Sequence, residues 1–472
     1  MKTKNQIENQ ISKKRFEKKL KRKLKKKKLL REKYFKYLEF KKTLNDDVSY
    51  ANLLEKFLPT NLKFILSCEK SNFYLTKLNK VYTNNRGIFK VPKDFSIIDF
   101  PNESYKFIQE LTAALILQKY DAVVLDYKDC KRLDLGAQVF LDIILRDILT
   151  FFKICEKYPN TRVRVKSISG KNINNEDIKK LLFSVGSPAI HSNRTLHFND
   201  IEPYKLCLHN RDKDGDRLRI MEQKDIDTTT LVDYVLKSLK RLNKTLTPEK
   251  LDDLCTVIGE ILINAEEHST TKYRFSIGYF HEINENNNHY GVFRLVIMNF
   301  GNTIYEKFKD KDCPNINVVK KMKDLSESYN KRNFFLKKEF EEETLWTLYA
   351  LQEGVTSIAP VIYKRRGNGS IQFIESFFNI KGRQNNADDI SIMTILSGNT
   401  NITFDGTYNI TEHKIEEENF KYMTFNQSGK IEDKPDKKFV KFVDNYFPGT
   451  IISAKILFNE DDIKENIKKD EK

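Results

Sequence analysis

The stretch Leu251–Ser269 (LDDLCTVIGEILINAEEHS) constrains the fold most, because its apolar residues recur at the spacing of one helical face. The preceding Thr247-Pro248 pair supplies a capping hydroxyl and a proline suited to the first helical position. Along the edge of the apolar face a polar residue stands at every fourth position, namely Glu260, Asn264 and His268. This spacing predicts a core helix that presents a carboxylate, an amide and an imidazole toward a pocket.

These three residue types suit chemistry with a metal ion. A carboxylate can orient water or an attacking hydroxyl, and an amide oxygen can ligate Mg²⁺. A solvated helix face has a similar composition, so the helix by itself leaves both interpretations open. His268 can also have a purely structural role, because a histidine at a helix end can cap backbone carbonyl groups.

The chain is long enough for several domains. It has 472 residues, of which 39% are hydrophobic and 12% aromatic, as in globular proteins with more than one core. No apolar run approaches the roughly 20 residues of a membrane-spanning helix, and the lysine-rich start lacks the apolar segment of a secretory signal. The six cysteines are scattered without a CxxC pair, which predicts reduced thiols in a cytoplasmic protein and no zinc site.

The excess of positive charge is confined to the first 44 residues. They contain 19 Lys and Arg residues against four Glu residues, a net charge of +15, whereas the whole chain carries +17. The other 428 residues therefore carry only +2. A thin apolar stripe predicts that residues 1–44 form a basic helix suited to nucleic acid, an anionic membrane surface or an acidic partner. A solvated arm without a specific partner is the alternative.

Strand and helix patterns alternate between residues 120 and 185, which favours an α/β domain. Ala122–Leu125 has the pattern of a buried strand, and apolar spacing predicts a helix from Leu135 onward. A second strand (Arg162–Ile168) and a second helix (Glu176–Phe183) follow. This segment resembles the STAS domains of anti-sigma-factor antagonists, in which a buried strand ending in Asp leads through a short loop into a helix.

A departure from the STAS pattern favours partner docking or packing over a phosphorylation switch, and an ordinary buried strand-loop-helix unit is the alternative to the resemblance. In STAS domains a phosphorylated serine lies at the start of this helix, but residues 134–137 are Asp-Leu-Gly-Ala and contain no hydroxyl. We place the STAS-like segment in a small α/β domain of residues 45–210. The polar, turn-rich residues 211–224 are predicted to be a linker, and residues 461–472 are predicted to be a charged tail.

Two glycine-containing segments follow the central helix. Strands predicted at Arg274–Phe280 and Phe293–Met298 are separated by a polar turn, and the second strand runs directly into Asn299-Phe300-Gly301. Glycine beside a side-chain amide lets a flat base approach the backbone closely. Further on, Arg365-Arg366-Gly367-Asn368-Gly369 open an apolar helix, and a glycine-rich helix N-terminus is a natural cradle for phosphate.

In this order the motifs resemble those of the Bergerat-fold (GHKL) superfamily, which includes ATPase domains of gyrase, heat-shock chaperones and sensor histidine kinases. The central helix is similar to the N-box, and the two glycine segments are similar to the two glycine boxes. The form Glu-x-x-x-Asn-Ala-x-x-His, from Glu260 to His268, is most similar to the anti-sigma-factor serine kinases. Gly449-Thr450 resembles the last strand of the fold, whose threonine lies near adenine. The resemblance covers residues 225–460 and implies an α/β sandwich with helices on one face of a mixed sheet.

The resemblance implies a role for each matching residue. Asn264 would ligate Mg²⁺ that bridges the phosphates of ATP, and Glu260 would polarise the attacking water or hydroxyl, with His268 in the same motif. Arg365 or Arg366 would neutralise charge that develops on the phosphoryl group, and residues 302–365 would form a lid. The nucleotide would be held by Asn264, Asn299, Gly301, Gly367, Asn368, Gly369 and Thr450.

One residue departs from the family pattern. The first glycine box normally begins with Asp, whose carboxylate accepts a hydrogen bond from the adenine amine, whereas here it begins with Asn299. The amide oxygen can accept the same bond, and the amide nitrogen can instead donate to a guanine carbonyl. No P-loop pattern occurs elsewhere in the sequence, so this is the one nucleotide site that the sequence offers.

The sequence therefore predicts a cytoplasmic protein that binds Mg-ATP and uses ATP binding, hydrolysis or phosphoryl transfer to a protein to change its contacts with a partner. An autophosphorylating histidine kinase is disfavoured, because His191, His197 and His209 lie in loop-like stretches and not on a dimerising helix. The alternative is a scaffold with a degenerate nucleotide fold, whose basic helix binds nucleic acid or an anionic surface.

Overall fold

The chain divides into two compact units, one formed by Met1–Leu58 and Thr150–Val163 and the other by Pro59–Leu149 and Arg164–Lys472. The computed structural model describes residues 50–81, 86–158, 167–190, 196–210, 217–267, 271, 273–285, 288–331, 340–357, 369–380, 391–415, 418–457 and 463–465. The basic segment 1–44 lies outside these residues. Within them, no helix is both long and apolar enough to cross a membrane.

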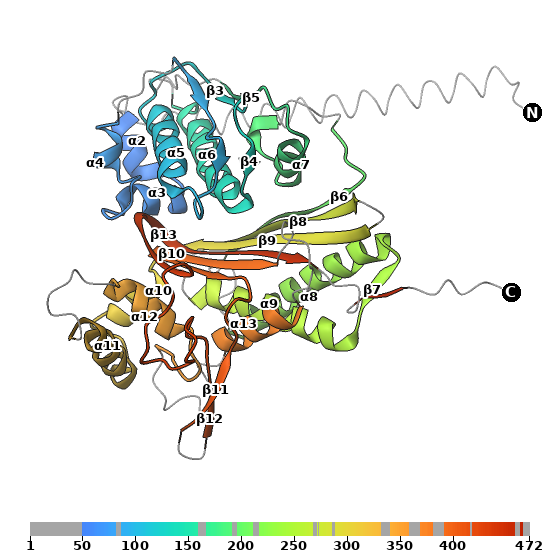
Figure 1. The fold of residues 1–472 in the computed structure, drawn as a ribbon. Coiled ribbons are helices and arrows are strands. Elements are labelled where there is room, and N and C mark those ends of the chain that lie inside the picture. The colour runs from blue at the N-terminus through green and yellow to red at the C-terminus, as the bar shows by residue number, and fades with distance from the viewer. Residues whose placement is uncertain are drawn as a thin grey trace, which may run out of the picture. The chain divides into compact units, whose positions relative to one another are not determined.

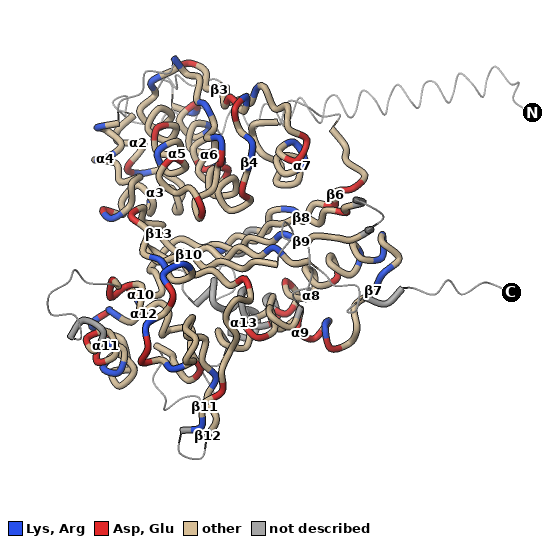
Figure 2. The backbone as a smooth tube through the Cα atoms, in the orientation of Figure 1, with Lys and Arg blue, Asp and Glu red and all other residues tan. Residues whose placement is uncertain are grey.

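A five-stranded sheet is the centre of the larger unit (Figure 1). Its order is β10-β13-β9-β8-β6, with β6 (Ile201–Asn210), β8 (Tyr273–Glu285), β9 (Asn288–Phe300), β10 (Ile392–Phe404) and β13 (Val440–Leu457). Its four neighbouring pairs are all antiparallel. The prediction of a mixed central sheet is therefore wrong. The predicted α/β class is confirmed, since the unit contains both helices and sheets. Much of the length of the central strands is uncharged (Figure 2), because the sheet is covered on both faces.

Three helices cover one face of this sheet: α8 (Arg217–Arg241), α9 (Pro248–Glu267) and α13 (Gly369–Ile380) (Figure 1). The predicted central helix is confirmed as α9, and its first backbone bond runs from Leu251 N–H to the carbonyl of Thr247 at 3.0 Å. Because strand side chains alternate between faces, every second residue of β9 joins one hydrophobic core with α9. That core contains Leu254, Val257, Ile258, Phe293, Leu295 and Ile297.

Residues between the two glycine segments form part of the core and not only a lid. They include α10 (Ile304–Lys309), α11 (Ile316–Lys331) and α12 (Glu342–Ala350). Trp346 of α12 is 2% exposed, and its indole N–H donates to the Ser326 hydroxyl of α11 at 3.2 Å. Since α12 packs against β10, the expected lid over residues 302–365 is corrected: this helix is a fixed part of the hydrophobic core.

An α/β layer of the same unit covers the opposite face of the sheet. Phe140 of this layer packs against Phe300 and Phe447, with ring centroids 6.1 and 5.2 Å apart. Its strands pair in parallel, β1-β3-β5 and β2-β4. The elements are β1 (Ile88–Lys90), β2 (Asp94–Phe95), β3 (Ala122–Asp126), β4 (Arg132–Leu133), β5 (Ser167–Lys171), α3 (Thr60–Ser67), α4 (Leu75–Leu78), α5 (Pro101–Ile116), α6 (Leu135–Cys155), α7 (Glu176–Ser184) and a 3₁₀ turn (Pro188–Ile190).

The predicted elements of this layer agree with the structure except at one strand. The strand at 122, the helix from Leu135 and the helix from Glu176 are confirmed. The side chain of Asn175 caps α7 by accepting from the N–H groups of Asp177 and Ile178, which fixes where that helix begins. The second strand begins at Ser167 in the structure, and residues 162–166 of the predicted strand lie outside the described part of the chain.

Three expected boundaries are corrected by the pairing of strands. β6 was expected in the domain 45–210, but it pairs with β8 at the edge of the central sheet. The expected linker 211–224 is helical from Arg217 onward. The expected charged tail 461–472 contains β14 (Ile463–Glu465), which pairs with β7 (Lys244–Leu246). A further hairpin, β11 (Thr411–Ile415) with β12 (Glu418–Tyr422), completes the larger unit.

The described part of the smaller unit consists of α2 (Tyr50–Phe57) and the end of α6 with the turn after it. Aromatic pairs join them, since Tyr50 lies 5.8 Å from Phe151 and Phe57 lies 5.6 Å from Tyr158 between ring centroids. Contacts of this kind give a short helix the apolar packing that it lacks in isolation.

A buried carboxyl in α6 makes the stability of the α/β layer depend on pH. Burial raises the pKa of Asp142 from 3.8 to about 7, although Ser187 and Gln138 donate hydrogen bonds to its Oδ1 at 2.9 Å. Since the folded state binds this proton more tightly than the unfolded state, the contribution to stability is full below pH 4 and is lost as the pH rises through about 7. Burial raises the pKa of Asp134 and Asp147 to about 6, which acts in the same direction.

We therefore expect Asp142→Asn to stabilise the protein by about 4 kcal/mol at pH 8 and by little at pH 4, because the amide keeps the shape and removes the charge. Urea unfolding at several pH values measures the difference. An equal effect at both pH values would contradict the assignment of the proton to Asp142.

Candidate functional site

A row of buried polar side chains crosses four strands of the central sheet near the end of β9. Its members stand directly opposite one another in register and are at most 5% exposed: Arg274 on β8, Asn299 on β9, Thr450 on β13 and Ser397 on β10. Residues directly opposite one another share a face of a sheet. Because Ile297 and Ile452, two positions away, belong to the core with α9, the row lies on the helical face.

Asn299 is the member of the row without a partner. It is 0% exposed, and neither its amide oxygen nor its amide nitrogen has a hydrogen-bond partner among the described residues. Leaving such a group unpaired in the interior costs roughly 1–3 kcal/mol. The hydroxyls of Thr450 and Ser397, by contrast, are 2.9 Å apart, and Ser397 also accepts from the N–H of Ile304 at 3.0 Å. A ligand with both a donor and an acceptor would therefore be recognised best at Asn299.

A buried ion pair lies at the other end of the row. Arg274 donates to the carboxylate of Asp227 on α8 at 2.8 Å, and the two side chains are only 6% and 10% exposed. The pair ties α8 to the strand that neighbours Asn299, so it helps to fix the position of the row against the helices.

The backbone around Asn299 leaves no room for a side chain at the facing position of β13. Gly449 has a φ of +147°, and a Cβ at this position would lie 2.1 Å from the carbonyl oxygen of Asn299. Gly301 has a φ of +144°, and its N–H donates to the carbonyl of Pro448 at 3.3 Å. Both glycines are required by these conformations, which side chains rarely adopt. The chain then enters α10 through a capping box formed by Thr303 and Glu306.

The structure brings part of the predicted site to one side of the sheet. Asn299 is near the end of β9 and Gly301 directly follows that strand, while Thr450 stands directly opposite Asn299 within β13. The helix α9 packs along both β9 and α13. Glu260 and Asn264 lie within α9, and Gly369 is the first residue of α13. The side chains of Glu260 and Asn264, and all of His268, Arg366, Gly367 and Asn368, lie outside the described residues. In the described part of the chain, no group of three or more His, Cys, Asp or Glu could hold a metal ion.

Two members of the row were missed from the sequence. The sequence pattern marks Arg274 only as the first residue of the predicted strand Arg274–Phe280, and it does not mark Ser397. A charged residue within a strand that is otherwise buried is the signal that would have pointed to Arg274. Nothing local distinguishes Ser397, because its place in the row follows from the pairing of β10 with β13.

Comparison with known proteins finds no relative of this chain. No family model matches the chain, and no curated protein and no solved structure matches it. Assignment of function therefore depends on the geometry of the sheet and on the motifs of the sequence.

Proposed function

We propose that this chain binds Mg-ATP on the helical face of its central sheet, in the manner of the Bergerat-fold superfamily. The observation that carries the proposal is the buried amide of Asn299, whose donor and acceptor have no partner among the described residues. The edge of adenine carries a matching amine donor and ring-nitrogen acceptor. Thr450, directly opposite on β13, would contact the same base.

Residues of α9 and residues at the start of α13 would bind the metal ion and the phosphates. Backbone N–H groups at the start of α13, at Gly369, and in the preceding residues Gly367 and Asn368 would hold phosphate. Asn264 would ligate Mg²⁺, and the bound ion would neutralise part of the negative charge of the phosphates. Glu260 would orient water or a hydroxyl, and Arg366 and His268 would act on the phosphoryl end. The packing of α9 along α13 supports this division of roles.

Binding would act on partners through the α/β layer, which we propose to be STAS-like. Glu306 lies one turn after Gly301 and accepts from Lys70 of that layer at 2.6 Å, from the hydroxyl of Tyr446 at 3.0 Å and from the N–H of Thr303 at 3.0 Å. These donors hold the pKa of Glu306 below its ordinary value. A ligand that moves residues 301–303 therefore changes a contact with the layer. Hydrolysis of ATP or phosphoryl transfer to a protein would reset this contact.

Thermal or chemical unfolding in the presence of a nonhydrolysable ATP analogue tests the proposal. At a ligand concentration 100 times Kd, we expect stabilisation of about 2.7 kcal/mol, lost when Mg²⁺ is chelated. Asn264→Ala should remove the dependence on Mg²⁺, and Asn299→Ala should weaken binding about tenfold through loss of the contact with the base. Asn401→Ala is the matched control, since Asn401 is also a buried asparagine, four positions beyond Ser397 on β10.

The base that is bound is tested by Asn299→Asp. A carboxylate accepts from the adenine amine but cannot donate to a guanine carbonyl, so the variant should prefer ATP over GTP more strongly than the parent. Binding that is unchanged in all three variants would refute the site. The alternative scaffold would then be favoured by nucleic-acid binding that depends steeply on salt and disappears on deletion of residues 1–44.

A further inference from the structure

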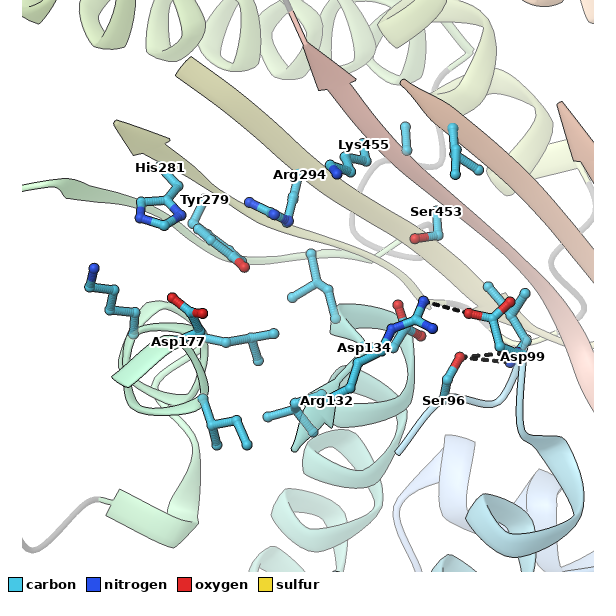
Figure 3. A pocket seen from close by; sticks show the side chains of 18 of the residues that line it. Ser96, Asp99, Arg132, Asp134, Asp177, Tyr279, His281, Arg294, Ser453 and Lys455 are labelled. Carbon is cyan, nitrogen blue, oxygen red and sulfur yellow. Dashed lines mark hydrogen bonds and ion pairs between the residues drawn. The ribbon is translucent and has the colours of Figure 1, made fainter. Parts of the chain in front are cut away.

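A cleft of about 920 Å³ lies on the opposite face of the central sheet from the polar row, between the strands and the α/β layer (Figure 3). Its floor includes Tyr279, Arg294 and Lys455, which stand directly opposite one another on β8, β9 and β13. Its other wall includes Asp134 at the start of α6 and Asp177 in the first turn of α7. A cleft of this volume is in the range of sites for small molecules.

Arg294 is a cation of this cleft that forms no ion pair with a carboxylate in the described part of the chain, in contrast to two of its neighbours. Arg132 is paired with Asp99 at 2.5 Å, and Lys180 is paired with Asp200 at 2.5 Å. Among the described residues, no carboxylate forms an ion pair with Arg294, and its buried Nη1 has no hydrogen-bond partner. The guanidinium carbon lies 5.4 Å from the centre of the Tyr279 ring, a contact that orients the group without neutralising it. A half-buried guanidinium whose buried Nη1 is an unused donor is suited to a carboxylate or phosphate oxygen.

The opposite wall determines the rest of the ligand chemistry. Figure 3 shows Arg294 extending from the sheet and Asp177 extending from α7 on the other side of the space. The lining contains five Lys and Arg residues and five Asp and Glu residues, so a purely anionic ligand would meet as many like charges as opposite ones. Burial lowers the pKa of His281, with Arg294 and Lys180 acting in the same direction, so this residue adds little charge at neutral pH. Apolar side chains complete the wall: Leu133, Ile178 and Leu181.

We propose that this cleft binds a small zwitterion of the amino-acid type, with its carboxylate on Arg294 and its ammonium group on Asp177. The apolar residues of the wall would contact the side chain of the ligand. A free amino acid and a short peptide share this chemistry, and the test below separates them. The proposal does not depend on the nucleotide site, because the two sites use opposite faces of the sheet.

The test measures binding to the full chain by calorimetry, with the common L-amino acids and short peptides as probes. Acetate, an alkylamine and inorganic phosphate serve as probes that carry one kind of charge only. We expect at least one zwitterion to bind more tightly than every probe of a single charge sign. Tighter binding by the free amino acids identifies them as the ligand, and tighter binding by the peptides identifies a peptide.

Three variants locate the site. Arg294→Met keeps the apolar stem over Tyr279 and should weaken binding of the zwitterion at least tenfold. Asp177→Asn should weaken it to a similar extent, and because Asp177 is exposed on α7, this variant carries the test if Arg294→Met does not fold. Arg132→Met is the matched control and should change the affinity less than twofold, since Arg132 is engaged by Asp99. Absence of binding by every zwitterion, or equal binding of inorganic phosphate that is indifferent to Asp177→Asn, would overturn the proposal.

Discussion

Replacing Gly449 by alanine is expected to destabilise the protein by about 4 kcal/mol or more. The φ of +147° is a conformation that residues with a side chain rarely adopt. The added Cβ would lie 2.1 Å from the carbonyl oxygen of Asn299 and 2.8 Å from the Cα of Phe300. Both are backbone atoms of the neighbouring strand, so no change of rotamer relieves the clash, and β13 must move away from β9. Urea unfolding of the variant measures the loss.

A second glycine supplies the matched control with the opposite sign. Gly259 lies within α9, and the nearest atom to a Cβ there would be the Thr228 hydroxyl at 3.9 Å. Since alanine is preferred over glycine in a helix interior, Gly259→Ala should stabilise the protein by about 1 kcal/mol. If the two substitutions change the free energy of unfolding by similar amounts, β13 does not approach Asn299 as closely as described.

Removal of Asp227 is the second substitution with a large expected effect. Asp227→Ala leaves the guanidinium of Arg274 buried without the carboxylate that lies 2.8 Å from it, which typically costs about 3–5 kcal/mol. Arg274→Met should also destabilise, because it leaves the acid without its partner. The double variant Asp227→Ala/Arg274→Met should be more stable than the sum of the two losses predicts, since it contains no isolated charge.

A double-mutant cycle by urea unfolding gives the coupling energy of this pair. A coupling of about 2 kcal/mol or more is expected for two groups in contact in the interior. Additive effects of the two single substitutions would show that the pair is screened by solvent and does not hold α8 to the sheet.

The sequence was most informative where a short local signal defines an element. α9 and α6 begin at Pro248 and Leu135 as expected, because a capping residue or a regular apolar spacing marks those positions. The strands β8 and β9 were also expected, although both extend further than predicted into what was taken as a polar turn. Hydrogen bonding across a hairpin can carry polar residues into strands that their own propensity would not favour.

The sequence was least informative where the structure depends on pairing between distant segments. β6 was assigned to the wrong domain, because nothing in its own residues shows that its partner is β8. α12 falls within the range 302–365 that was predicted as a lid, because local composition does not reveal that its apolar residues meet β10. The polar row shows the same limit: Asn299 and Thr450 were found as motif residues, whereas Arg274 and Ser397 entered only through strand register.

Because side chains alternate along β9 and β13, both strands contribute residues to both faces of the sheet. Asn299 and Thr450 face the helices, while Arg294 and Lys455, an odd number of residues away along the same strands, face the cleft. Any ligand that twists or slides these strands from one side displaces groups on the other. Thermodynamic reciprocity then requires that each ligand alter the affinity for the other by the same factor. Two small molecules that bind on opposite faces would in this way change each other's affinity through a single layer of backbone, without any direct contact.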